Sequence, residues 1–204
     1  MHPTVVDTDV FPPLWHPVAM TADPSDVVAE TARLRIRPWR LEEAPRLLDI
    51  HRRVAVVKWL DDGEPKLMKD LAEAQGRIED YREWSASPPR GFWAIEVRET
   101  GRVAGSVLIV DVPNAENDEV QVGWHLHPDS WGQGYAAEAA AAVITYGLDH
   151  GLRQILALTH LDNHPSQALA RRIGMERLGI TEQWYETPSE VFRAAAGTWR
   201  PRDS

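Results

Sequence analysis

The feature that most constrains the fold is a strand, a glycine-containing turn, an alanine-rich helix and a second strand, which follow one another over residues 119–159. Residues 119–126 alternate between apolar and polar, as a strand with one buried face requires. The segment PDSWGQGYAAEAAAAVITYGLDHG then leads through a turn into a helix that ends at Gly151, and residues 154–159 have the pattern of a short buried strand. This order is a βαβ unit, so the two strands should be parallel with a right-handed crossover.

The rest of the organised chain supplies the elements that would complete one α/β (α+β) domain. Gly101 can adopt the positive φ that a tight hairpin between two of the strands needs. Pro165 suits the first turn of a helix, and Gly174 suits its C-terminal end. The predicted strands are residues 31–37, 92–98, 102–110, 180–185 and 191–194, and the predicted helices are residues 41–53, residues 69–84 and a helix that opens at residues 162–166.

Residues 1–29 differ from the rest, because they contain five prolines and no helical or strand period. We therefore divide the chain into a proline-rich N-terminal arm, residues 1–29, and one domain, residues 30–204. The apolar residues of the arm could lie along the domain or against a partner subunit, which leaves a homodimer open.

Composition excludes several classes of partner. The net charge of −9 argues against a nucleic acid or an anionic membrane as the partner, since neither would meet a cationic face. The chain has no cysteine, which excludes disulfides, thiolate nucleophiles and cysteine-ligated metals. It also lacks an apolar run of the roughly 18 residues that a membrane span needs. The first ten residues do not resemble a secretion signal, so we expect a cytoplasmic protein.

The sharpest chemical feature is the turn WGQGYA, residues 131–136, between a strand and the start of a helix. Unpaired amides and the helix dipole at such a position favour an anion, and the glycines leave room for a pyrophosphate to approach the main chain. A tight turn packed on a neighbouring strand is the equally weighted structural alternative. A Walker loop is excluded because Tyr135 stands where its lysine would be, and a dinucleotide fold is excluded because Ala137 replaces its third glycine.

Three segments in the right order resemble the GCN5-related N-acetyltransferases (GNAT), and within them the ribosomal-protein alanine N-acetyltransferases. They are TARLRIRPWRLEEAPRLL, VGWHLHPDSWGQGYAAEA and DNHPSQALARRIGM, and the resemblance covers residues 31–193. It implies a mixed, mainly antiparallel sheet flanked by helices, with a splayed parallel strand pair that binds acetyl-CoA.

The resemblance also implies which residues hold the cofactor. His125, Leu126 and His127 would offer main-chain groups to the pantetheine arm, and Asn163 and Ser166 would contact it from the next strand and helix. The turn would wrap the pyrophosphate. Its residues are Trp131, Gly132, Gln133, Gly134, Tyr135, Ala136 and Ala137.

The implied function is transfer of the acetyl group of acetyl-CoA to a primary amine, by direct attack in a ternary complex and without a metal. The acceptor would be a protein N-terminus or a small-molecule amine. A main-chain N–H near Leu126 would stabilise the developing oxyanion. Glu119 is the candidate base, with a solvated strand-end carboxylate as the alternative. Trp59 and Gln121 are the candidate acceptor contacts, although core packing also explains Trp59.

The proton donor to the leaving thiolate departs from the family pattern. Many members carry a tyrosine where this chain has Ala170. Ser166 could donate a hydrogen bond to sulfur, or serve only as a first-turn helix hydroxyl, and Tyr185 is a second candidate. A thiolate is a tolerable leaving group because thiol pKa values lie near 8.5, so the acid could be dispensable. A non-catalytic acyl-CoA-binding module and a partner-binding scaffold therefore stay open as alternative functions.

Overall fold

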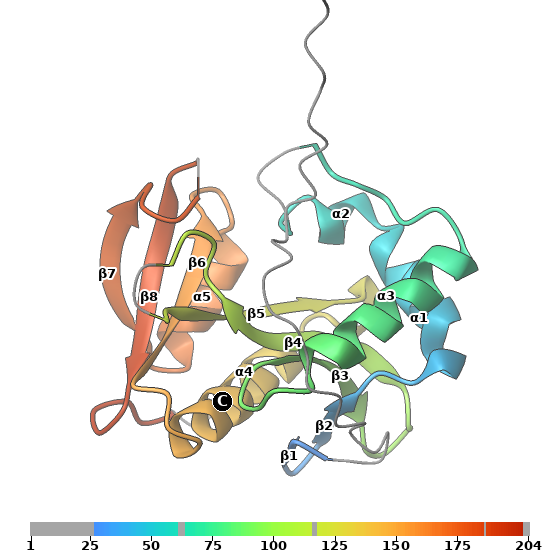
Figure 1. Cartoon of the computed structure of the whole chain (residues 1–204), viewed down its shortest axis with the longest axis horizontal. Helices are drawn as coiled ribbons and strands as arrows, with labels where there is room; N and C mark the ends of the chain where they lie inside the picture. The colour runs from blue at the N-terminus through green and yellow to red at the C-terminus, as the bar shows by residue number, and fades with distance from the viewer. Residues whose placement is uncertain (1–26, 61–63, 116–117, 186, 202–204) are drawn as a thin grey trace, which may run out of the picture.

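The computed structural model describes residues 27–60, 64–115, 118–185 and 187–201, and its centre is an eight-stranded sheet (Figure 1). The strand order is β1-β2-β3-β4-β5-β6-β8-β7. All neighbours are antiparallel except β5 and β6, which are parallel. This is the mixed, mainly antiparallel sheet that the family resemblance implied. The strands are β1 (Ala29–Glu30), β2 (Leu34–Pro38), β3 (Gly91–Val97), β4 (Val103–Asp111), β5 (Val120–Leu126), β6 (Gln154–His160), β7 (Glu176–Thr181) and β8 (Ser189–Ala195).

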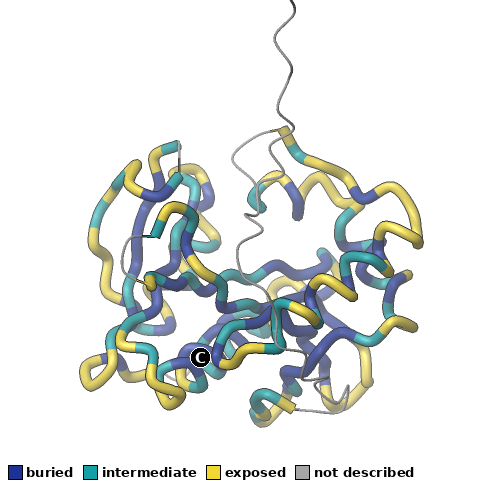
Figure 2. Tube along the Cα trace, in the orientation of Figure 1, coloured by how far each residue is buried: buried dark blue, intermediate teal, exposed yellow. Residues whose placement is uncertain are grey.

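Helices cover both faces of this sheet. Those described are α1 (Ala44–His51), α2 (Val54–Val57), α3 (Leu71–Trp84), α4 (Tyr135–Asp149) and α5 (His164–Arg172), with short 3₁₀ turns at Leu41–Glu43 and Pro128–Ser130. One buried cluster joins α1 and α3 to β3 and β4, and another joins α4 and α5 to the opposite face. The strands between the helices form the buried interior (Figure 2). None of the helices described is long and apolar enough to cross a membrane.

The parallel pair diverges soon after it forms. β5 and β6 share one register position, Gln121 opposite Leu156, and β5 continues to Leu126 without a strand beside it on that edge. By contrast, β4 and β5 pair over seven positions. The splay that the resemblance implied is therefore present, and it opens the sheet between the C-terminal halves of β5 and β6.

Two predicted elements were wrong in their bounds. The helix expected at residues 41–53 is a 3₁₀ turn followed by α1 and α2, since Arg53 adopts an extended conformation and breaks it. The strand expected at residues 180–185 lies earlier, as β7, and Tyr185 follows it in a loop. β7 is an edge strand with exposed Leu178 and Ile180 and a register shift before Gly179, so its residues do not alternate as a half-buried strand does.

The N-terminal boundary is only partly described. Ala29 and Glu30 form β1 against β2, and the Val28 N–H donates to the Ile36 carbonyl at 2.8 Å. The sheet therefore includes at least one residue that we assigned to the arm. Residues 1–26 lie outside the described part of the chain, so the arm itself stays a prediction.

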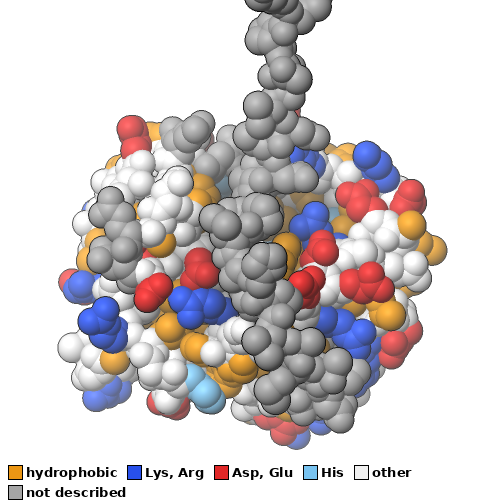
Figure 3. All heavy atoms as spheres, in the orientation of Figure 1, with side chains coloured by type: hydrophobic (Ala, Val, Ile, Leu, Met, Phe, Trp, Pro, Cys, Tyr) orange, Lys and Arg blue, Asp and Glu red, His pale blue; other side chains and the backbone are white. Residues whose placement is uncertain are grey.

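Charged side chains of both signs are interspersed over the described part of the face in Figure 3. This mixture agrees with a small acidic domain whose surface carries no single dominant sign there.

Candidate active site

The turn before α4 has the conformation of an anion cradle. Gly132 and Gly134 have φ values of 74° and 77°, which side-chain-bearing residues rarely adopt. The first hydrogen bond of α4 runs from the Glu138 N–H to the Gly134 carbonyl at 3.1 Å. The amides of residues 134–137 therefore precede the helical ladder and have no carbonyl of their own helix to bind. All four residues line a cavity.

Contacts from the segment between β1 and β2 and from the end of β5 hold this turn in shape. The Arg33 guanidinium donates to the Gln133 carbonyl at 2.9 Å and to the Glu138 carboxylate at 2.7 Å. Thr31 donates to the other oxygen of Glu138 at 2.5 Å. On the far side, the Trp131 indole donates to the Leu126 carbonyl at 2.9 Å, which ties the turn to the end of β5. The cradle is thus preorganised rather than formed by a loose loop.

Two arginines that the sequence did not single out stand at this cradle. A β-carbon at position 134 would lie 3.4 Å from one nitrogen of Arg33 and 3.8 Å from one nitrogen of Arg172. Both side chains line the cavity. Arg33 is neutralised by Glu138, whereas Arg172 has no ion-pair partner within the described ranges. Each arginine is more than 35 residues from Gly134 in the sequence. No local sequence pattern therefore indicates that either one approaches it.

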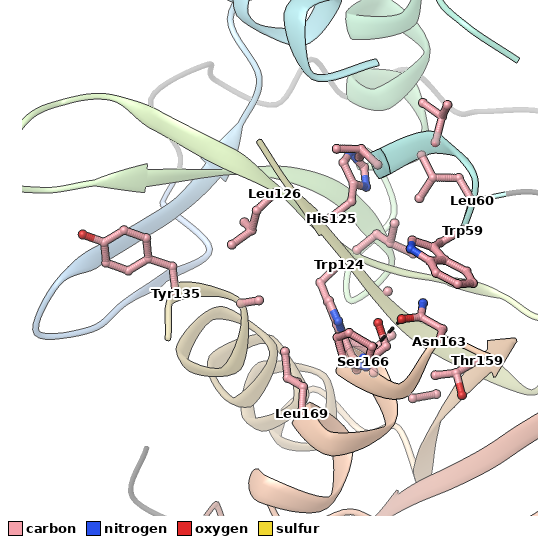
Figure 4. A pocket seen from close by; sticks show the side chains of 18 of the residues that line it. Trp59, Leu60, Trp124, His125, Leu126, Tyr135, Thr159, Asn163, Ser166 and Leu169 are labelled. Carbon is pink, nitrogen blue, oxygen red and sulfur yellow. Dashed lines mark hydrogen bonds between the residues drawn. The ribbon is translucent and has the colours of Figure 1, made fainter. Parts of the chain in front are cut away.

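The cavity has a volume of about 1640 Å³ and extends from the cradle through the splay toward α1 and α3. Sites for one drug-sized ligand measure roughly 300–1,000 Å³, so this one has room for two molecules at once. Figure 4 shows the side chains of β5 on one side of it and those of α5 on the other, with Tyr135 at the start of α4. The arrangement suits a reaction between two bound substrates.

Main-chain N–H and C=O groups on the free edge of β5 point into this cavity. His127 N–H donates to the Ala104 carbonyl at 2.9 Å and the Glu119 carbonyl accepts from Val112 at 2.9 Å, so the odd-numbered residues face β4. Since successive residues point their main-chain groups to opposite edges, those of Trp124 and Leu126 face β6. Both residues line the cavity. Their amides are therefore available where the strands separate.

His127, by contrast, lies outside the cavity. Its N–H and carbonyl bind Ala104 and Ser130. Its ring Nε2 lies 2.9 Å from an Asp49 oxygen, and Nδ1 accepts from the Asp129 N–H at 3.1 Å. Burial and then Arg46 lower the pKa of His127, although Asp49 raises it. His127 therefore makes contacts within the protein, whereas His125 and Leu126 line the cavity.

Asn163 and Ser166 meet the cavity at the start of α5. The Asn163 side chain caps the helix, accepting from the Ser166 N–H at 3.3 Å, and both residues line the cavity (Figure 4). Ala170 is fully buried in the core between α5 and the sheet. The position where the family pattern has a tyrosine therefore belongs to the packed interior.

Most of the predicted catalytic and acceptor residues line the cavity, but one does not. Tyr185, Gln121 and Trp59 all line the cavity, and the Gln121 amide donates to the Tyr185 hydroxyl at 2.5 Å. Glu119 stands just before β5, on the side of Gln121 away from the cradle, and is not part of the cavity wall. The structure brings Tyr185 and Ser166 to the same cavity as the cradle, and it does not bring Glu119 there.

Comparison with known proteins identifies the family. The family model for the acetyltransferase (GNAT) domain matches residues 33–176. An uncharacterised N-acetyltransferase of Bacillus licheniformis is 26% identical over 168 residues, covering 79% of this chain and 89% of that protein. An acetyl coenzyme A-N(2)-transacetylase of Aspergillus fumigatus is 28% identical over 143 residues, covering 62% of this chain and 60% of that protein.

Solved structures share the fold. A ribosomal L7/L12 α-N-protein acetyltransferase in complex with coenzyme A superimposes with a TM-score of 0.70 at 17% identity, covering 84% of this chain and 98% of the other. The ribosomal-protein-S5-alanine acetyltransferase of Vibrio fischeri gives 0.67 at 15% identity, covering 84% and 98%. The family match spans more than half of the sequence and includes β5, the cradle and α5. The chain therefore belongs to the acetyltransferase (GNAT) family and is an acyltransferase.

Proposed function

We propose that the chain transfers the acetyl group of acetyl-CoA to a primary amine, a protein N-terminus or a small-molecule amine, within a ternary complex. The observation that carries the proposal is the cradle of residues 132–137, whose unpaired amides and two arginines suit a pyrophosphate. Two similar proteins support the choice of ligand, since one is named for acetyl coenzyme A and another was solved with coenzyme A.

The residues fit the cosubstrate along its length. The amides of Gly134, Tyr135, Ala136 and Ala137 would hold the pyrophosphate, with Gly132 and Gln133 shaping the turn and Trp131 anchoring it to β5. The main-chain groups of Trp124 and Leu126, together with Asn163 on α5, would hold the pantetheine arm in the splay. When bound, acetyl-CoA supplies an activated thioester carbonyl.

The chain's own groups would then orient the reaction. The acceptor nitrogen attacks the carbonyl carbon, so that a C–N bond forms, the C–S bond breaks, and one proton leaves the nitrogen. The Leu126 N–H would stabilise negative charge that develops on the carbonyl oxygen. Tyr185 accepts a hydrogen bond from Gln121 and still carries its own O–H proton, so it can protonate the thiolate. The base role of Glu119 stays a prediction, and because Glu119 is not part of the cavity wall it would act through water.

Two variants can show whether Tyr185 or Ser166 is the proton donor. Tyr185→Phe should lower kcat about tenfold, at the weak end of general-acid effects because the thiolate already leaves readily near neutral pH. Ser166→Ala should leave kcat within about threefold, since the variant keeps the Ser166 backbone N–H that donates to the Asn163 side chain. Steady-state kinetics with one amine acceptor would decide, and a larger loss in Ser166→Ala would assign the role to serine.

Arg172 is expected to contribute long-range attraction to the phosphates. Arg172→Gln should weaken acetyl-CoA binding about tenfold at low salt, and less at 0.5 M salt, because screening shortens the reach of exposed charges. Calorimetry at both salt concentrations measures this. Arg82→Gln removes the same charge from α3 outside the cavity and should leave the affinity unchanged. Equal losses in the two variants would show that net charge alone is responsible.

Thiol release in a panel of amines and N-terminal peptides tests the activity itself. Amine-dependent release of coenzyme A, with the acetylated amine found by mass spectrometry, is the expected result. Tight binding of acetyl-CoA without release in any acceptor would instead favour a non-catalytic acyl-CoA-binding module. Failure to bind acetyl-CoA would favour a scaffold in which the glycines only form a turn.

A further inference from the structure

The end of the cavity away from the cradle is walled by a continuous series of rings. Tyr81 stacks on Phe92 with ring centroids 3.8 Å apart, Phe92 lies 6.0 Å from His125, and His125 meets His51 edge-on at 5.0 Å. Trp84 extends the series, 5.7 Å from Tyr81. All five line the cavity, and they come from α1, α3, β3 and β5. We call this wall the ring wall.

Apolar side chains pack against the ring wall, and one charged lining residue, Arg77, lies over its Trp84 ring at 6.0 Å. Val56, Met68, Leu108 and Val110 line the same region. The charged lining residues nearest to it in the chain are Lys66, Lys69, Glu73 and Arg77. Among the residues described, three of these four are basic, so a ligand with several positive charges would be repelled. The region suits an apolar or aromatic group instead.

The two histidines of the ring wall carry buried ring nitrogens without a hydrogen-bond partner among the described residues. The buried His125 ring has no hydrogen-bond partner for either nitrogen among the described residues, and the same holds for Nε2 of His51. Buried polar groups are almost always paired, so such orphans call for an explanation. Both residues line the cavity, and a ligand that shifts the neighbouring side chains covering these nitrogens could supply the missing bonds.

Burial keeps both histidines uncharged. It lowers the pKa of His51 to about 4, with a further contribution from Arg77, and it lowers the pKa of His125 well below its usual value, with a further contribution from His51. A neutral imidazole has one N–H and one bare nitrogen, and the bare nitrogen can accept a hydrogen bond from an amine. His125 also directly precedes Leu126, whose amide faces the splay. The main chain of His125 is therefore adjacent to the amide expected at the thioester carbonyl, and its ring lies on the side of β5 that packs against His51 and Phe92.

We propose that His51 and His125 recognise the acceptor amine, and that the acceptor carries an aromatic or branched apolar group next to its amino group, seated on the ring wall. This inference rests on the proposed function and narrows its acceptor. The chemistry is shared by a peptide whose first residue is Phe or Leu and by a small arylalkylamine, so both sources belong in the test.

The first measurement compares acceptors with the unaltered chain. Peptides that differ only in a first residue of Phe, Leu, Ser or Lys are assayed with acetyl-CoA, beside phenethylamine and spermidine. The kcat/KM of the Phe or Leu peptide, or of phenethylamine, should exceed that of the Ser and Lys peptides and of spermidine at least about tenfold, from burial of the apolar group. A peptide preference over phenethylamine identifies a protein N-terminus as the source, and the reverse identifies a small amine. Preference for spermidine or for the Lys or Ser peptide would overturn the proposal.

The second measurement removes the histidines. His125→Leu and His51→Leu should each raise KM for the preferred acceptor about tenfold, the effect of one lost hydrogen bond to a buried group. Acetyl-CoA affinity should stay within about twofold. The melting temperature should hold or rise, because an unpaired buried polar group has been replaced by an apolar one. His150→Leu, on an exposed histidine outside the cavity, is the matched control. Unchanged KM in both variants would contradict the proposal, and Asn at either position repeats the test if a Leu variant fails to fold.

Binding separates this inference from the proposed function. Phenethylamine and the Phe peptide are titrated by calorimetry into the chain saturated with coenzyme A. Binding that is lost in His125→Leu supports the ring wall as the acceptor site even if no acetyl transfer is seen, in which case only the proposed function fails. Acetyl transfer to amines that do not use the ring wall would leave the function standing and refute the inference.

Discussion

Ala136→Glu should weaken acetyl-CoA binding at least about 100-fold. Ala136 is the second residue of α4, lines the cavity and stands among the amides of the cradle. A carboxylate there would lie a few ångströms from the pyrophosphate, where two like charges repel by about 4 kcal/mol at the effective dielectric constant of a protein surface. Each 1.4 kcal/mol is a factor of ten in affinity, so calorimetry should detect little or no binding.

The fold should survive this change. A glutamate in the first turn of a helix interacts favourably with the helix dipole, so the melting temperature should remain near that of the unaltered chain. Position 136 is preferable to position 134, because any side chain at Gly134 would also strain a backbone with positive φ. Thr145→Glu places the same charge on the exposed part of α4, outside the cavity, and should bind acetyl-CoA normally. Undiminished binding by Ala136→Glu would mean that the pyrophosphate lies elsewhere.

Glu96→Ala should destabilise the domain by about 3 kcal/mol. Arg37 is 1% exposed and donates to Glu96 at 2.7 Å and to Glu43 at 2.9 Å. Removing one partner of a buried ion pair leaves an uncompensated charge and typically costs 3–5 kcal/mol. We expect the low end of that range because Glu43 remains. For a domain of this size the melting temperature should fall by roughly 6–12 °C.

Thermal unfolding of a matched variant provides the control for Glu96. Glu30→Ala removes a carboxylate that pairs with Arg35 on the exposed edge of the sheet, at 2.8 Å. Exposed ion pairs contribute little, so its melting temperature should stay close to that of the unaltered chain. Similar losses in Glu30→Ala and Glu96→Ala would contradict the view that the buried Arg37 makes the difference.

Much of the fold could be predicted because its signals are local. The alternation in residues 119–126, the glycines of the cradle and the cap at Gly151 each belong to one short segment, and the structure confirms the βαβ unit that they define. β7 was misplaced for the opposite reason. Its apolar residues face solvent at an edge, while Trp184, in the loop that follows, packs into a small cluster with Val191 and resembles strand residues in sequence.

The site could be predicted only in part. The residues of the cradle are consecutive in the sequence, and Asn163 and Ser166 belong to one short segment. The sequence pattern and the family resemblance could therefore identify them. Arg33, Arg172 and the ring wall are brought together by tertiary packing between elements far apart in the chain, and each looks unremarkable where it stands in the sequence. His51 and His125 illustrate this, because 74 positions separate two rings that lie 5.0 Å apart.

A crystal structure with bound acetyl-CoA tests the central claim most directly. The expected density places the pyrophosphate within hydrogen-bond distance of the amides of residues 134–137, near Arg172, with the thioester in the splay between β5 and β6 beside Leu126. Density for the nucleotide at any other place, or a cradle filled by the protein's own side chains while the ligand is bound, would contradict it.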